Sequence, residues 1–184
     1  MEPVTSAAIQ QFIQRLAERY GDAGTLYLMG GSALCLLGSP RETRDVDYTF
    51  EVAPEATPRF RAALAEVAAE LQLDLEDVPI AEFIPLPPEA SERRRALGRY
   101  GQLDVYIFDP YTIALSKIAR GFEADIEDVV FLLRTGVIEF AELERLFGVI
   151  LPKAPQADID RKEFRAYFEE IRRRVTPGRS EGKR

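Results

Sequence analysis

The stretch LYLMGGSALCLLGSPRETRDVDYTF, residues 26–50, joins two apolar runs through unusual residues. The first run ends in Gly30 and Gly31, and the second opens fourteen residues after Gly31 with the pair Asp45 and Asp47. A short apolar run that ends in glycine predicts a buried strand. The order of strand, glycine pair, short helix and acidic strand is the feature that decides the fold.

The acidic run DVDYTFEV, residues 45–52, alternates strictly, which predicts a strand with one buried face. Residues two apart on a strand point the same way, about 7 Å apart, so Asp45 and Asp47 project together. Two carboxylates this close repel each other unless a cation lies between them. Oxygen ligands without cysteine or histidine favour Mg²⁺ or Mn²⁺ over zinc.

The glycine pair supplies the other half of the predicted site. The sequence predicts a strand over 25–30 and a helix of two turns over 32–38, so backbone N–H groups near Ser32 meet an anion at the start of a helix. The absence of Cβ atoms at Gly30 and Gly31 lets the chain approach a phosphate closely. A metal motif beside a phosphate motif predicts a metal–nucleoside-triphosphate site.

Composition excludes several classes of chemistry. The chain of 184 residues has no histidine and a single cysteine, Cys35, which removes the Ser-His-Asp and Cys-His schemes and an internal disulfide. A net charge of −7 argues against broad non-specific binding of nucleic acid. No apolar run approaches the roughly 20 residues of a membrane span, and the first residues lack a signal-peptide pattern, so we expect a cytoplasmic protein without membrane contact.

The remaining periodicities predict an α/β (α+β) fold: a small mixed sheet flanked by helices, followed by a helical C-terminal part. We expect a sheet-based core with an N-terminal helix at 1–109, helices at 110–175 and a disordered tail at 176–184. The expected helices are 4–20, 57–71 and further ones starting near 110, 125, 140 and 160; further strands are expected within 73–84 and at 103–108, with a proline-rich loop, PLPPEASERRRALGRYG, at 85–101.

GGSAL followed by RETRDVDYTF resembles the signature of the nucleotidyltransferase superfamily, the polymerase-beta-like fold. LDVYIFDPYTIALSKIARGFEADIEDVVFLL is similar to an uncharacterised prokaryotic branch whose relatives include toxins of toxin–antitoxin and abortive-infection systems. The resemblance covers roughly residues 25–135. It implies a sheet-based core with a two-metal site that uses Mg²⁺ or Mn²⁺ and takes a nucleoside triphosphate as substrate.

The resemblance also implies roles for individual residues. Gly30, Gly31 and Ser32 would hold the triphosphate, and Asp45 and Asp47 would coordinate the metal ions. The third carboxylate of the metal site would come from a later strand, where Asp104 fits by type and Glu76 and Asp77 are rivals. Lys117 and Arg120, three residues apart on one helix face, would clamp phosphates or lie as a surface pair.

Several other polar and charged residues have two interpretations each. Arg41 and Thr43 either touch the substrate or shape the turn before the acidic strand. Asp125 and Asp128 either serve the site or cap a helix. A basic cluster in the proline-rich loop either receives a nucleic-acid acceptor or partner or is simply solvated; it consists of Arg93, Arg94, Arg95 and Arg99.

The function predicted first is transfer of NMP from an NTP to an RNA, such as the 3′ end of a tRNA, or to a protein hydroxyl. Its use would be that of a toxin with a cognate partner protein. The alternative is an inactive relative, for example an antitoxin component, that binds a nucleotide or a partner. An aminoglycoside-modifying enzyme is a weaker possibility, because SKIARG…DIEDV does not resemble that class.

Overall fold

The computed structural model describes residues 3–176, so the predicted tail lies, apart from Thr176, outside the described residues. The chain divides into two compact units, which we describe separately. The first comprises residues 1–79 and 91–109, and the second comprises residues 80–90 and 110–184. No helix within 3–176 is long and apolar enough to cross a membrane.

The first unit is built on a five-stranded mixed sheet with the order β3-β2-β1-β5-β4. Its central strand β1 runs parallel to β5 and antiparallel to β2, while β2 is parallel to β3 and β4 is antiparallel to β5. The mixed sheet flanked by helices confirms the predicted fold class. The strands are β1 (Gly24–Leu28), β2 (Asp45–Glu51), β3 (Asp74–Asp77), β4 (Arg95–Tyr100) and β5 (Leu103–Ile107).

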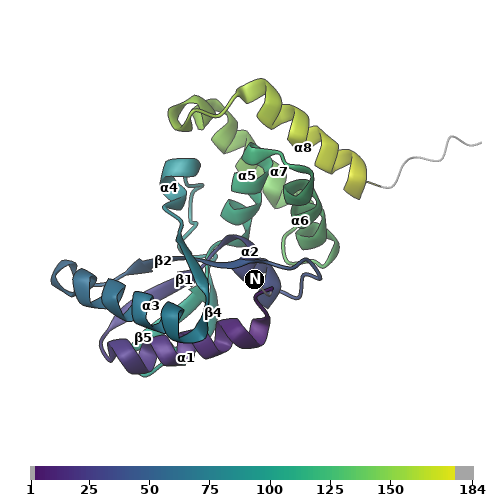
Figure 1. Ribbon diagram of the computed structural model, residues 1–184. Helices are drawn as coiled ribbons and strands as arrows, with labels where there is room; N and C mark the ends of the chain where they lie inside the picture. Colours follow the sequence, from purple (N-terminus) through teal and green to yellow (C-terminus); the bar gives the residue numbers. More distant parts are fainter. Residues whose placement is uncertain (1–2, 177–184) are drawn as a thin grey trace, which may run out of the picture. The chain divides into compact units, whose positions relative to one another are not determined.

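Two long helices cover one face of this sheet. α1 (Ser6–Tyr20) and α3 (Thr57–Leu71) pack against each other and enclose a core with the apolar side chains of β1, β2 and β5 (Figure 1). The predicted alternation of β2 is confirmed, because Val46 and Tyr48 are buried in that core. Its acidic side chains therefore rise from the opposite, open face. The short helices α2 (Gly30–Leu36) and η1 (Pro54–Ala56) follow β1 and β2.

Two predictions between residues 73 and 101 were wrong. Of the strands expected within 73–84, with a break near Pro79, only β3 forms; it ends at Asp77, and Ile80–Phe83 is the short helix α4 of the second unit. The expected loop contains β4, which pairs with β5 and is irregular between Ala96 and Gly98. An edge strand with charged side chains and a bulge lacks the period-two apolar pattern by which strands are recognised.

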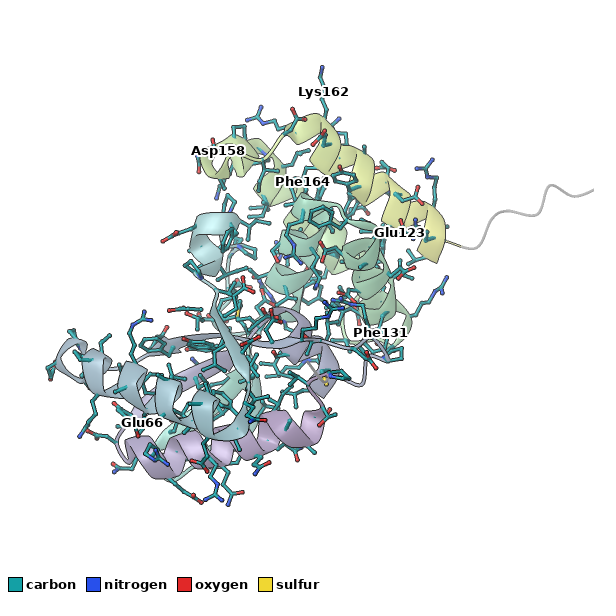
Figure 2. All side chains as sticks on the ribbon, viewed as in Figure 1. Glu66, Glu123, Phe131, Asp158, Lys162 and Phe164 are labelled. Atoms are coloured by element: carbon teal, nitrogen blue, oxygen red, sulfur yellow. The ribbon has the colours of Figure 1, made fainter. Side chains whose placement is uncertain are left out.

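The second unit consists of helices around an aromatic core. Phe147 stacks on Phe168 with ring centroids 4.1 Å apart and packs against Phe164 at 4.7 Å. Figure 2 shows Phe164 directed inward from its helix and Lys162 directed outward. The helices are α5 (Pro110–Arg120), α6 (Glu123–Arg134), α7 (Phe140–Ile150), η2 (Leu151–Ala157) and α8 (Arg161–Val175). Asp160 caps α8, the helix expected to start near residue 160, whereas α6 begins two residues before Asp125.

We expect Phe60→Ala to lower the free energy of unfolding by about 3–5 kcal/mol, because it empties the centre of the first core. Phe60 is fully buried, and its ring centroid lies 4.8 Å from that of Tyr20 and 4.6 Å from that of Phe50. Urea unfolding followed by circular dichroism measures the change. The matched control is Phe83→Ala, which removes a ring that is 56% exposed and should leave the midpoint unchanged. Equal shifts for the two variants would contradict the assigned core.

Candidate active site

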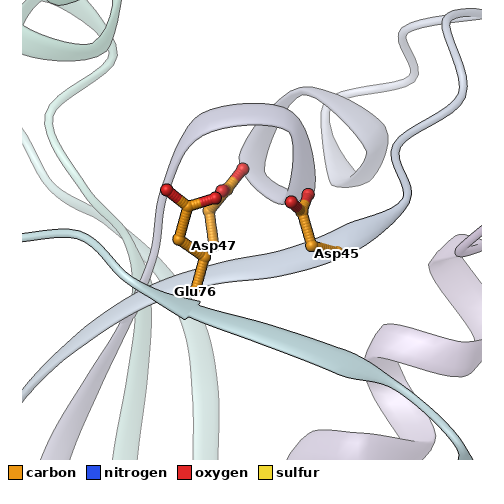
Figure 3. Close-up of side chains that lie close together, drawn as sticks. All are labelled: Asp45, Asp47 and Glu76. Atoms are coloured by element: carbon orange, nitrogen blue, oxygen red, sulfur yellow. The ribbon is translucent and has the colours of Figure 1, made fainter.

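Three carboxylates converge on the open face of the first unit. Asp45 and Asp47 come from β2 and Glu76 from β3, where the strand register sets Asp47 opposite Glu76. One oxygen of each lies within 4.8 Å of the others, and the three side chains rise from the same side of the two strands (Figure 3). We call these residues the acidic trio. Asp45 and Asp47 are half-buried and Glu76 is exposed, so the trio remains open to a substrate.

The turn made by Gly30 and Gly31, called here the glycine turn, lies against the trio. Gly31 donates its backbone N–H to Asp47 Oδ2 at 2.6 Å. Gly30 has a left-handed φ of +43°, and a Cβ at this position would lie 2.2 Å from the same oxygen. A Cβ at Gly31 would lie 2.5 Å from the hydroxyl of Thr43. Both glycines are therefore required by the close approach of the turn to its neighbours.

Ser32 and Thr43 connect α2 and the preceding loop to the acidic strand. Ser32 is fully buried; its hydroxyl accepts the N–H of Asp47 at 2.8 Å and donates to the carbonyl of Asp45 at 3.3 Å. Its side chain is thus committed to β2. The hydroxyl of Thr43 donates to Asp45 Oδ1 at 3.2 Å, while its carbonyl accepts the N–H of Val4 at 2.8 Å. These two hydroxyls hold the aspartates in place.

The structure thus brings together six of the residues predicted for the site, with Glu76, the rival of Asp104, as the seventh. Asp104 pairs with Thr25 of β1, whereas Asp47 lies at the level of Met29. The four residues between these two levels correspond to roughly 13 Å along the strand at the usual rise per residue. Asp104 faces Arg99 at 3.7 Å instead. Arg41 is exposed on the loop before β2, with its N–H on the hydroxyl of Ser39.

Lys117 and Arg120 belong to the second unit, where they form a charged cluster with two aspartates. Lys117 Nζ lies 3.1 Å from Asp125 and 2.8 Å from Asp128, and all three side chains are at least 95% buried. Arg120 reaches Asp125 at 2.6 Å from a side chain that is 59% exposed. One oxygen of Asp125 has no hydrogen-bond partner within residues 3–176. The cluster balances two positive against two negative charges.

Sequence reasoning left Glu76 as a rival of Asp104, and only the strand register separates them. The sequence does contain one indication for Glu76: it follows Asp74 by two residues on a short strand, so both side chains lie on the same side. However, the choice requires the knowledge that β3 pairs with β2 in parallel, with Glu76 opposite Asp47. A single sequence does not provide the register between strands that are 22 residues or more apart.

We expect Gly30→Ala to weaken Mn²⁺ binding by at least about tenfold, because the new methyl group displaces the Asp47 carboxylate. The matched control is Gly38→Ala: Gly38 also has a left-handed φ, +89°, but a Cβ there meets nothing within 4 Å. Both variants pay roughly 1–2 kcal/mol for the left-handed backbone, so their stabilities should fall together. Calorimetric titration with Mn²⁺ separates them, and equal affinities would contradict the role of the turn.

We expect Lys117→Met to destabilise the protein by about 3–5 kcal/mol, because it leaves two buried carboxylates without their shared cation. Arg120→Met is the control: it also removes a cation from Asp125, but the exposed pair should cost less than about 1 kcal/mol. Chemical unfolding of both variants measures the difference. A stable Lys117→Met variant would show that the lysine is not required to compensate the aspartates.

No curated protein matches the chain. One solved structure that matches is that of an antigenic nucleotidyltransferase-like protein from Paracoccidioides brasiliensis; it is 17% identical, covers 90% of this chain and 95% of its own, and superimposes with a TM-score of 0.47. A family model described as "Nucleotidyltransferase of unknown function" (DUF6036) matches residues 7–176. The chain therefore belongs to this family of nucleotidyltransferases.

Proposed function

We propose that this protein transfers a nucleoside monophosphate from a nucleoside triphosphate to a hydroxyl of an RNA, such as the 3′ end of a tRNA, or of a protein. The reaction would require Mg²⁺ or Mn²⁺ at the acidic trio. The observation that carries the proposal is the approach of three carboxylates within 4.8 Å beside a turn without Cβ atoms. Membership of the family of nucleotidyltransferases supports the class of reaction.

The donor atoms of the trio fit a hard divalent cation. All are carboxylate oxygens, which are the ligands that Mg²⁺ and Mn²⁺ prefer, and the trio includes neither histidine nor cysteine. Three carboxylates at this spacing repel one another, so a cation would relieve the repulsion that the fold imposes. When bound, such a cation neutralises phosphate charge and stabilises both the attacking and the leaving oxygens of an in-line displacement.

The chemical step is a displacement at the α-phosphorus. The acceptor oxygen forms a bond to this phosphorus, and the bond from phosphorus to the oxygen that bridges to the β-phosphate breaks. Pyrophosphate leaves with that electron pair, and the proton of the acceptor hydroxyl passes to solvent. The protein contributes position and a fixed electrostatic environment, which are the main sources of rate enhancement in phosphoryl transfer.

Residues of the first unit take separate roles in this proposal. Gly30 and Gly31 allow the phosphates to approach the backbone, and Ser32 and Thr43 hold the two aspartates. Glu76 replaces Asp104 as the proposed third carboxylate, because it is the acid that reaches the other two.

Further cations are proposed to contact phosphate. One is Arg41, on the loop before β2; Lys117 and Arg120 are proposed as phosphate-binding cations of their own unit. The ion pairs of Lys117 with Asp125 and Asp128 would have to be kept or exchanged for phosphate in that role.

We extend the proposal to growth control. An enzyme that modifies tRNA or protein would slow growth when it acts without restraint, so a cognate partner protein would hold it in check. The expected sign is slow growth of a bacterium that expresses the wild-type chain, and normal growth with an inactive variant.

We expect Asp47→Asn and Glu76→Gln each to lower NMP transfer by at least about 100-fold, or ~2.7 kcal/mol of transition-state stabilisation. The measurement is incorporation of label from each α-labelled NTP with Mg²⁺ or Mn²⁺ and bacterial total RNA or lysate. Asp104→Asn is the control and should retain near wild-type activity, because its carboxylate faces Arg99.

Three outcomes would contradict this assignment. Loss of transfer in Asp104→Asn with retention in Glu76→Gln would restore Asp104 to the site. Retained transfer in Asp47→Asn would remove the metal assignment. A wild-type chain that binds Mn²⁺ and NTP but labels nothing would favour a nucleotide-binding protein over an enzyme.

A further inference from the structure

Arg94 lies on the open face of the sheet and is held there by two tyrosines. Its guanidinium carbon lies 4.3 Å from the ring centroid of Tyr106, and one of its N–H groups donates to the hydroxyl of Tyr27 at 3.1 Å. The rings of Tyr27 and Tyr106 stack with centroids 5.9 Å apart. We call Arg94, Tyr27 and Tyr106 the tyrosine–arginine patch.

Tyr27 fixes the orientation of this arginine. Burial, and then the neighbouring Glu51 carboxylate, raise the pKa of the Tyr27 phenol, so it stays protonated at neutral pH. It can therefore donate to Glu51, at 3.1 Å, while it accepts from Arg94. Arg94 thus receives a defined position from a neutral partner and keeps its remaining N–H groups available.

Arg94 also differs from the arginines around it, because it has no carboxylate within 4 Å in the described chain. Two of these arginines face carboxylates: Arg93 binds Asp109 through two bonds of 3.0 and 2.8 Å, and Arg99 faces Asp104. Residues 1–79 and 91–109 carry 10 Lys+Arg against 16 Asp+Glu, a net charge of −6. An exposed cation without an ion pair in so acidic a unit is suited to an anion from outside.

The register of the sheet places this patch beside the acidic trio. Tyr27 pairs with Thr49, so it is the diagonal neighbour of Asp47 on the same face, about 7–8 Å away between Cα atoms. Tyr106 is the next residue across, opposite Tyr27. The guanidinium therefore lies on the order of 10 Å from Asp47.

The glycine turn and the patch flank the trio from opposite directions along β1. Gly30 and Gly31 follow the end of the strand, whereas Tyr27 precedes that end. In-line displacement requires the attacking oxygen and the leaving pyrophosphate on opposite sides of the α-phosphorus. If the glycine turn takes the triphosphate, the acceptor must approach from the side of the patch.

We propose that the tyrosine–arginine patch is the acceptor subsite, and that it binds the terminal nucleotide of a single-stranded RNA 3′ end. This inference rests on the proposed function and selects RNA over a protein hydroxyl. The plane of a guanidinium stacks on unpaired bases, and the fork of its N–H groups matches a phosphate. Arg94 contributes one cation to a unit of charge −6, which suits one terminal nucleotide better than a long or duplex polyanion.

The test compares Arg94→Gln, Arg94→Lys and the matched control Arg95→Gln. Arg95 is the next residue but pairs with Ile107, whose side chain enters the core, so it projects from the other face. In NMP transfer to a single-stranded RNA oligonucleotide we expect Arg94→Gln to raise the KM for RNA about tenfold and to leave the KM for NTP within about twofold. Arg94→Lys should recover only part of the loss, because it restores charge without the planar fork. Arg95→Gln should behave as wild type.

Fluorescence anisotropy with the same oligonucleotide, without NTP, gives a readout that does not need catalysis. The Arg94→Gln variant should bind at least about fivefold more weakly, and the slope of log K against log salt should fall by about one. Wild-type transfer with an unchanged RNA KM in Arg94→Gln, or label found on protein, would overturn the subsite and leave the transferase intact. No transfer, together with Arg94-dependent binding of RNA, would overturn the transferase and leave the subsite.

Discussion

The close approach of the glycine turn to Asp47 is the constraint on which the rest of the site depends. The Asp47 carboxylate occupies the space that a Cβ at Gly30 would need, and Gly31 donates its N–H to the same carboxylate. The buried hydroxyl of Ser32 then bonds the backbone of β2 on both sides of Val46. Together these contacts fix α2 on the acidic strand, and with it the direction in which both aspartates point.

This arrangement brings three carboxylates together, and the stability of the fold offsets their repulsion. α1 and α3 bury the apolar side of β2, so the alternation of the strand forces Asp45 and Asp47 onto the open face. The parallel pairing of β3 adds Glu76 at the same level. The stability of the core thus holds these carboxylates together, and the cation proposed above would relieve their repulsion.

Much of this unit follows from one sequence because its signals are local. The alternation in 45–52 predicts the strand and both of its faces, and the glycine pair predicts the turn. Non-local features do not follow. Glu76 and Asp104 are equal candidates until the register is known, and RRRALGRY, residues 93–100, has the composition of a solvated loop although 95–100 is an edge strand. The position of Arg94 on the face of Tyr106 depends on that strand and could not be foreseen.

Lys117 is a second case in which the sequence does not reveal the surroundings of a residue. A lysine and an arginine three residues apart on a helix suggest a phosphate clamp, and nothing in the sequence states that Asp125 and Asp128 already enclose the lysine. A buried cation with two carboxylates is expensive to desolvate, and an apolar core would stabilise α5 and α6 at least as well. An unpartnered oxygen of Asp125 in the described structure adds to that cost. The cluster therefore fixes α5 and α6 through charge pairing, at a desolvation cost that apolar side chains in the same positions would not carry.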